Sequence, residues 1–168
     1  MSDGTIRTAF PSWPLYNRRL RDVVAALTEA QLAVQPAPDR WPLWATIGHL
    51  ACQRVSWLCG FAGEPGAAQT PFPNALYECP GDEDLEHVLG AHELAEALDA
   101  TFAIVERCLD TWTPAMLAEE IRRTFDGETW AHTRGAVLQR VFAHDVYHIA
   151  ELNEALGRAG LAQVALWD

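Results

Sequence analysis

The sequence predicts an all-α protein, a four-helix antiparallel bundle that forms a single domain over residues 1–168. Apolar residues recur at helical spacing in four long segments, and Gly- or Pro-rich stretches separate these segments. A chain of 168 residues with 49% hydrophobic content is long enough to bury one substantial core. Residues 1–11 carry no such pattern and are expected to form a loose N-terminal tail.

The first helix is expected over residues 12–28. Ser12 suits the N-cap position, and Pro14 falls in the first turn, where a missing N–H costs nothing. Its apolar stripe consists of Trp13, Tyr16, Leu20, Val23, Val24 and Leu27. The Gln-Pro-Ala-Pro sequence at 35–38 then interrupts the helical pattern.

The second helix is expected over residues 42–60. Beside its apolar stripe runs a second stripe in which every member except His49 is small: Ala45, His49, Cys52, Ser56 and Cys59. Small residues let another helix approach closely, or they leave space around the imidazole. Both interpretations remain open at this point.

Residues 60–81 are rich in Gly and Pro and predict a long loop of the kind that often serves as a lid or binding loop. Its apolar residues Phe72, Leu76 and Tyr77 are expected to pack against the domain. Asp82 is predicted to cap the third helix, which runs to about residue 111.

The remaining chain predicts a short helix over 114–120, a β-hairpin at 121–130 around an Asp-Gly turn, and a final helix over 133–156. The final helix has two apolar stripes, and the second is expected to contact a partner subunit in a homodimer. The first stripe consists of Val137, Val141, His144, His148, Leu152 and Ala155; the second consists of Leu138, Phe142, Ile149 and Leu156.

Composition excludes several functional classes. With 12 Lys+Arg against 23 Asp+Glu, the net charge is −11, which argues against nucleic acid as a partner. No run of about 18 apolar residues predicts a membrane span. The four cysteines form no CxxC pair, and the first residues lack an apolar signal core, so a cytoplasmic protein with reduced thiols is expected.

His144 and His148 are four residues apart, so both rings project from one face of the final helix. Because they lie in an apolar stripe, their nitrogens need either hydrogen-bond partners or a shared metal ion. His49 could meet the pair across the bundle. Three neutral imidazoles would suit zinc or nickel and would leave the ion open to water or to a thiolate.

Other residues are candidates for supporting roles, each with an ordinary structural alternative. Cys52 is a candidate extra ligand one turn after the histidine of the second helix. Asp145 and Glu151 are candidates for orienting the ligand histidines. Trp44 is a candidate pocket wall, and His132 is a candidate for the pocket mouth. Zinc-peptidase, di-iron carboxylate, serine-hydrolase and Walker-type motifs are absent from the sequence.

Two motifs resemble a known family. The segment Arg-Trp-Pro-Leu-Trp-Ala-Thr-Ile-Gly-His-Leu at 40–50, and Thr-Arg-Gly-Ala-Val-Leu at 133–138 leading to His144 and His148, are similar to those of the DinB/YfiT-like superfamily. The resemblance extends from about residue 13 to residue 161.

The resemblance implies an up-down-down-up bundle, often a homodimer, with a divalent metal held at His49, His144 and His148. Nickel and zinc are the metals it implies. It also implies S-transferase or isomerase activity with a low-molecular-weight thiol such as mycothiol, bacillithiol or glutathione as cosubstrate.

Three functional hypotheses therefore follow. The first is a metal-dependent enzyme acting on a small molecule, either an S-transferase that uses a small thiol or a hydrolase-like enzyme that uses a metal-bound water. The second is a non-catalytic metal-binding module linked to stress response. The third is a metal-free helical interaction protein in which the histidines bond only to each other.

Overall fold

The computed structural model of the protein describes residues 4–82 and 84–167. The described residues are mostly helical, with one two-stranded antiparallel sheet, so the prediction of an all-helical architecture is confirmed in its main feature. The α-helices are α1 (Trp13–Ala25), α2 (Glu29–Leu32), α3 (Leu43–Val55), α4 (Ala91–Thr111) and α5 (Arg134–Arg158). The strands are β1 (Glu120–Phe125) and β2 (Glu128–Thr133).

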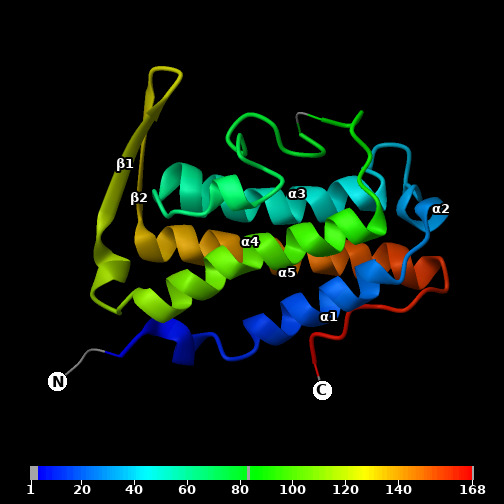
Figure 1. The fold of residues 1–168 in the computed structure, drawn as a ribbon, viewed down its shortest axis with the longest axis horizontal. Helices are drawn as coiled ribbons and strands as arrows, with labels where there is room; N and C mark the ends of the chain where they lie inside the picture. The colour runs from blue at the N-terminus through cyan, green and yellow to red at the C-terminus, as the bar shows by residue number, and fades with distance from the viewer. Residues whose placement is uncertain (1–3, 83, 168) are drawn as a thin grey trace.

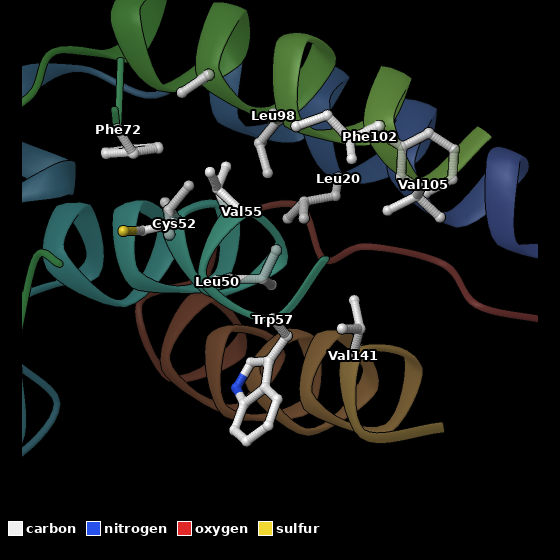
Figure 2. Packing of buried hydrophobic residues seen from close by; sticks show 14 of the residues in the cluster. Leu20, Leu50, Cys52, Val55, Trp57, Phe72, Leu98, Phe102, Val105 and Val141 are labelled. Carbon is white, nitrogen blue, oxygen red and sulfur yellow. The ribbon is translucent and has the colours of Figure 1, made fainter. Parts of the chain in front are cut away.

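The long helices pack side by side (Figure 1): α4 contacts both α1 and α3, and α3 also contacts α5. Leu20, Leu50, Leu98 and Val141, one from each long helix, are at most 2% exposed and meet in the core (Figure 2). Burial of each such side chain contributes about 1.5–3 kcal/mol, so packing rather than helix propensity holds the elements together.

The predicted first helix is in fact two helices. α1 ends at Ala25, and α2 begins after Thr28, whose backbone is extended. The Thr28 side chain accepts from the Gln31 N–H, and the Gln31 side chain accepts from the Thr28 N–H, which forms a capping box. This reciprocal cap starts a new helix where the apolar spacing alone predicted continuation.

The prediction of a loose tail over residues 1–11 is wrong for residues 6–9, which form a 3₁₀ turn. Ile6 is 3% exposed and its N–H donates to the Trp112 carbonyl. Arg7 donates to the Asp110 carboxylate at 2.8 Å. Residues 1–3 of the predicted tail lie outside the described residues.

α3 matches the predicted second helix, with a change of helix type at its end. The α-helical ladder stops at Val55 and a π-helical turn continues from Ser56 to Phe61. Almost every residue of α3 is buried, including His49 at 5% exposure.

The predicted start of the third helix at Asp82 is wrong. α4 begins at Ala91, and the Gly90 N–H at its N-cap donates to the Glu93 side chain. Leu85 and Val88, which fit the helical spacing, are 50% and 66% exposed. The described residues 62–82 and 84–90 are thus irregular apart from one short turn, over a longer stretch than the predicted 60–81. Its Phe72 is buried, whereas Tyr77 is 62% exposed.

The hairpin is confirmed. Phe125 pairs with Glu128, so Asp126 and Gly127 form a two-residue turn. Both have positive φ, 49° and 84°, which is the conformation that an Asp-Gly hairpin turn adopts. In place of the short helix predicted over 114–120 there is a single 3₁₀ turn, Met116–Ala118.

α5 begins as predicted, with the Thr133 side chain accepting from the Ala136 N–H at 3.1 Å. It continues past Gly157 and ends near Gly160, where φ is 68°. The second apolar stripe lies inside the protein's own core: Leu138, Ile149 and Leu156 are at most 2% exposed, and Phe142 packs against Trp13. The homodimer stays a prediction, without support from an exposed apolar face at these positions.

The prediction that all cysteines are reduced thiols is wrong for two of them. Cys52 on α3 and Cys79 in the long irregular segment form a disulfide across 27 residues. The irregular segment folds back over α3 and brings Cys79 to Cys52. The spacing of the cysteines in the sequence does not reveal this path of the chain. Cys59 and Cys108 are free thiols. Within the described part of the chain, no helix combines the length and apolar character that crossing a membrane requires.

Candidate metal centre

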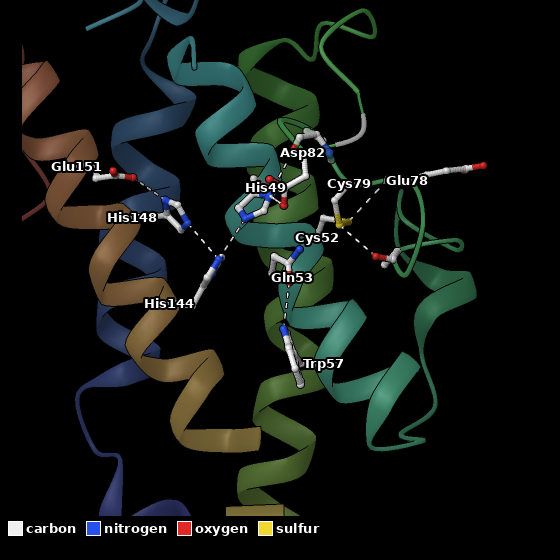
Figure 3. Close-up of polar contacts among 12 residues, drawn as sticks. His49, Cys52, Gln53, Trp57, Glu78, Cys79, Asp82, His144, His148 and Glu151 are labelled. Atoms are coloured by element: carbon white, nitrogen blue, oxygen red, sulfur yellow. Dashed lines mark hydrogen bonds and ion pairs between the residues drawn. A yellow bond between two sulfur atoms is a disulfide. The ribbon is translucent and has the colours of Figure 1, made fainter. Parts of the chain in front are cut away.

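Three imidazoles converge between α3 and α5. The Nε2 atom of His144 lies 3.2 Å from Nε2 of His49 and 3.1 Å from Nε2 of His148 (Figure 3). One ligand atom from each ring lies within 4.8 Å of the others. The structure therefore brings together the three histidines that the sequence singled out, here called the histidine cluster.

The helices account for this convergence. His144 and His148 project from α5 one turn apart, and α3 packs directly against α5. His49 reaches the pair from the buried face of α3. Two rigid, core-packed helices hold the rings, so the cluster does not depend on a loop for its ligand atoms.

Two of the rings have fixed outer partners. Nδ1 of His49 donates to the Pro80 carbonyl at 3.1 Å, with the Asp82 carboxylate 3.5 Å away. Nδ1 of His148 lies 2.8 Å from a carboxylate oxygen of Glu151, whose other oxygen accepts from Arg40. A carbonyl and a carboxylate can only accept, so both rings carry their proton on Nδ1.

This arrangement tests whether the cluster suits a metal ion. When each ring holds a single proton, on Nδ1, Nε2 of His49 and Nε2 of His148 each presents a lone pair toward Nε2 of His144. That third nitrogen has at most one proton to share between two acceptors, so hydrogen bonding alone leaves a lone pair unsatisfied. A divalent cation would accept all three lone pairs, and imidazole nitrogens are ligands that zinc and nickel prefer. The donor set fits.

Burial favours the metal-binding form of two of the three rings. Burial, followed by the neighbouring His148 and His49, lowers the pKa of His144 to about 3. Burial also lowers the pKa of His49, although the nearby Asp82 carboxylate opposes this shift. A ligand histidine must be neutral, so these shifts favour the coordinating state at neutral pH.

Of the supporting candidates, Glu151 occupies the predicted position next to a ligand ring. Asp145 does not: its carboxylate lies in the core and pairs with Arg54 at 2.9 Å. As the residue after His144 it is rotated by about 100° around the helix, toward the opposite face. Cys52 is not available as a ligand because it is bonded to Cys79.

The two remaining candidates make packing contacts. Trp44 is 4% exposed and belongs to the hydrophobic core. His132 sits on β2 against Trp57 and Phe61, with ring centroids at 5.8 Å and 5.3 Å. Each therefore fits its structural alternative, a packing role.

Sequence reasoning missed Pro80, Asp82 and Arg54. Pro80 and Asp82 lie in an irregular segment that folds back to the cluster. Such a segment has no periodic pattern in the sequence, so its position could not be predicted. Arg54 did carry a signal, because it is the one charged residue between Leu43 and Phe61. A lone charge in an apolar helix needs a buried partner.

A cavity of about 620 Å³ borders the cluster. Trp41, Tyr147, His148 and Glu151 contribute to its wall, together with Arg40. Trp41 also packs on the His49 ring, with centroids 4.8 Å apart. A volume of this size accommodates a small organic molecule next to the imidazoles.

Fold and site together define a helical protein with a three-histidine cluster able to hold a divalent metal ion. The profile of the DinB superfamily matches residues 17–152, and the chain belongs to this superfamily. The family expected from the sequence motifs is thus confirmed.

Solved structures show the same fold. A DinB-like protein from Bacillus cereus ATCC 10987 superposes with a TM-score of 0.70 at 19% identity, covering 98% of this chain and 99% of that chain. A conserved protein from Enterococcus faecalis gives a TM-score of 0.65 at 16% identity, covering 90% and 95% of the two chains. No curated protein matches the sequence.

Proposed function

We propose that this protein binds one divalent metal ion, nickel or zinc, through His49, His144 and His148, and that it is a metal-dependent enzyme of the small-thiol S-transferase type. The observation that carries the proposal is the convergence of three Nε2 atoms, of which two have their lone pairs directed inward by fixed Nδ1 partners. Family membership supports the same interpretation.

The protein's own residues supply orientation. The Pro80 carbonyl and the Glu151 carboxylate fix the ring tautomers of the outer two histidines, and Arg40 steadies the carboxylate from its other side. When bound, the ion would supply a Lewis acid that favours the thiolate form of a small thiol at neutral pH.

The neighbouring cavity supports a small-molecule substrate. Its wall combines aromatic surface from Trp41 and Tyr147 with charged groups from Arg40 and Glu151. Such a wall can hold both the apolar and the ionic parts of a small ligand. Because His148 is part of the same wall, a ligand in the cavity would lie beside the cluster.

Elemental analysis of protein purified without an affinity tag tests metal binding. We expect about one nickel or zinc per chain, and His49→Ala or His148→Ala should abolish it. His92→Ala is a matched control, because that side chain is 84% exposed. Absence of metal, together with no uptake from nickel or zinc buffers, would overturn the proposal.

A panel of small thiols with an electrophile such as monochlorobimane tests catalysis. Conjugation that requires the metal and disappears in His144→Ala supports the enzyme. A metal-loaded protein with no turnover on any thiol would instead indicate the non-catalytic module.

The up-down-down-up order of the long helices, the single domain and the homodimer belong to the same proposal. Light scattering at micromolar concentration tests the dimer directly. A monomeric mass would reject it without affecting the metal site, whose residues all come from one chain.

A further inference from the structure

One short segment, residues 79–82, supplies the outer support of His49. The Pro80 carbonyl accepts the Nδ1 proton of the ring at 3.1 Å, and the Asp82 carboxylate lies 3.5 Å from the same nitrogen. Figure 3 shows this segment crossing beside the ring, with the disulfide of Cys52 and Cys79 at its start. The tautomer of His49 therefore depends on where this segment lies.

The segment belongs to no helix and to neither strand of the sheet. The Gly81 N–H donates to the Asp84 carbonyl at 2.8 Å within the loop, and side-chain contacts place the segment against α3. Pro80 packs against Gly48 of α3, where an added Cβ would come within 3.0 Å of the proline ring. Gly81, with φ of 90°, lies under the Trp41 ring. The covalent tie is the disulfide, which joins the residue before Pro80 to Cys52, three residues after His49 on α3.

We propose that the disulfide between Cys52 and Cys79 is a redox switch on the histidine cluster. In the oxidised protein the tie holds Pro80 against His49 and directs the lone pair of Nε2 into the cluster. In the reduced protein the segment is free to leave α3, the Nδ1 proton loses its acceptor, and metal binding weakens. The inference rests on the proposed metal-binding function and adds redox regulation to it.

The chemistry requires a reductant, and a low-molecular-weight thiol is the class that fits. One thiolate attacks a sulfur of the disulfide and forms a mixed disulfide, and a second thiol releases the external disulfide. Two electrons and two protons pass to the protein, which then carries Cys52 and Cys79 as thiols. Both residues are at most 1% exposed, so the side chains that cover the two sulfurs must open locally before exchange, and we expect slow reduction.

The test uses the full-length chain with Cys59→Ala and Cys108→Ala, so that only the paired cysteines remain. Oxidised protein, and protein reduced with dithiothreitol and then desalted under argon, are titrated with zinc against a chromophoric chelator. We expect the reduced form to bind zinc about tenfold more weakly, the size of effect that loss of an outer partner of a metal ligand gives.

A second variant, Cys52→Ala with Cys79→Ala, excludes zinc binding by the newly formed thiols. It should match the reduced form and show no response to dithiothreitol. Circular dichroism confirms that it is helical. If it does not fold, the serine variant, Cys52→Ser with Cys79→Ser, takes its place as the thiol-free comparison.

A metal-free readout separates this inference from the proposed function. Long-range ¹H–¹⁵N spectra report the tautomer of His49, which should be Nδ1-protonated when oxidised and mixed when reduced. If neither form binds zinc, the metal-binding proposal fails, and the tautomer of His49 alone tests the role of the disulfide. A tautomer that shifts on reduction supports that role, and an unchanged tautomer overturns it. Zinc affinities within twofold of each other, or two free thiols in the untreated test protein by mass spectrometry, would also overturn the switch.

Discussion

The guanidinium of Arg54 and the carboxylate of Asp145 form an ion pair 2.9 Å long inside the helical core, with side chains 1% and 2% exposed. Asp145 also accepts from the Trp13 indole at 2.8 Å, and Arg54 donates to Asn17 and to the Leu98 carbonyl. This network joins α1, α3, α4 and α5 at one point. Removing either Arg54 or Asp145 would leave a buried charge without its partner.

Asp145→Ala should therefore lower the free energy of unfolding by about 3–5 kcal/mol, because it leaves Arg54 buried and uncompensated. Urea denaturation measures the change. Asp22→Ala is the matched control: its ion pair with Arg21 is on the surface, and its loss should cost under about 1 kcal/mol. Similar values for the two variants would contradict a stabilising role for the buried pair.

Zinc should stabilise the folded protein. At 100 times its dissociation constant, a ligand that binds only the folded state adds about 2.7 kcal/mol, which for a chain of this size raises the melting temperature by about 5–10 °C. Thermal denaturation with zinc and with a chelator measures the difference. His144→Ala should show no zinc-dependent shift, and a shift retained in that variant would place the ion elsewhere.

Acid should destabilise the metal-free protein. The pKa of His144 falls from 6.5 to about 3 on folding, so the unfolded chain takes up the proton first and stability decreases as the pH falls from 6.5 toward 3. The lowered pKa of His49 acts in the same direction. For His144 we expect a loss of about 1.4 kcal/mol per pH unit below 6.5.

Urea denaturation between pH 7 and pH 5, with a chelator present, measures this slope. His144→Gln, which has no titrating ring, should show a shallower slope than the wild-type chain. An identical slope in the two proteins would contradict the assignment of the effect to this ring.

Gly48→Ala should separate stability from metal affinity. Alanine is favoured over glycine in a helix by about 1 kcal/mol, but here its Cβ would lie 3.0 Å from the Pro80 ring. The two effects oppose each other, so the free energy of unfolding should change by under about 1 kcal/mol. Pro80 must move from His49, and zinc affinity should fall several-fold.

Gly135→Ala provides the comparison. Its Cβ would meet the Leu117 carbonyl at the same 3.0 Å, but it lies in the first turn of α5, more than two turns before His144. Zinc titration should find its affinity unchanged. Equal losses of affinity in the two glycine variants would show that Pro80 has no particular role.

The features that the sequence predicted well are those encoded locally. Helical spacing located the core of each long helix, and the Asp126–Gly127 turn located the hairpin. The spacing of His144 and His148 placed both rings on one face of α5. Period and turn chemistry are properties of neighbouring residues, so one sequence is sufficient to detect them.

The features that were missed depend on the tertiary path of the chain. Leu85 and Val88 match the helical period, but no core lies beneath them, and α4 starts only at Ala91. The disulfide of Cys52 with Cys79, and the contact of Pro80 with His49, require the return of an irregular segment onto α3. Loop residues carry no periodic signal from which that return could be read.

The hydrogen-bond acceptors of His49 and His148 differ in how easily a mutation can change them. The acceptor for His148 is the side chain of Glu151, which a single codon change can shorten, neutralise or delete. The acceptor for His49 belongs to the main chain at position 80, so any amino acid substituted there still presents a carbonyl. Natural drift or laboratory evolution can therefore retune the acceptor of His148 in small steps, whereas the carbonyl that accepts from His49 moves only when the backbone shifts.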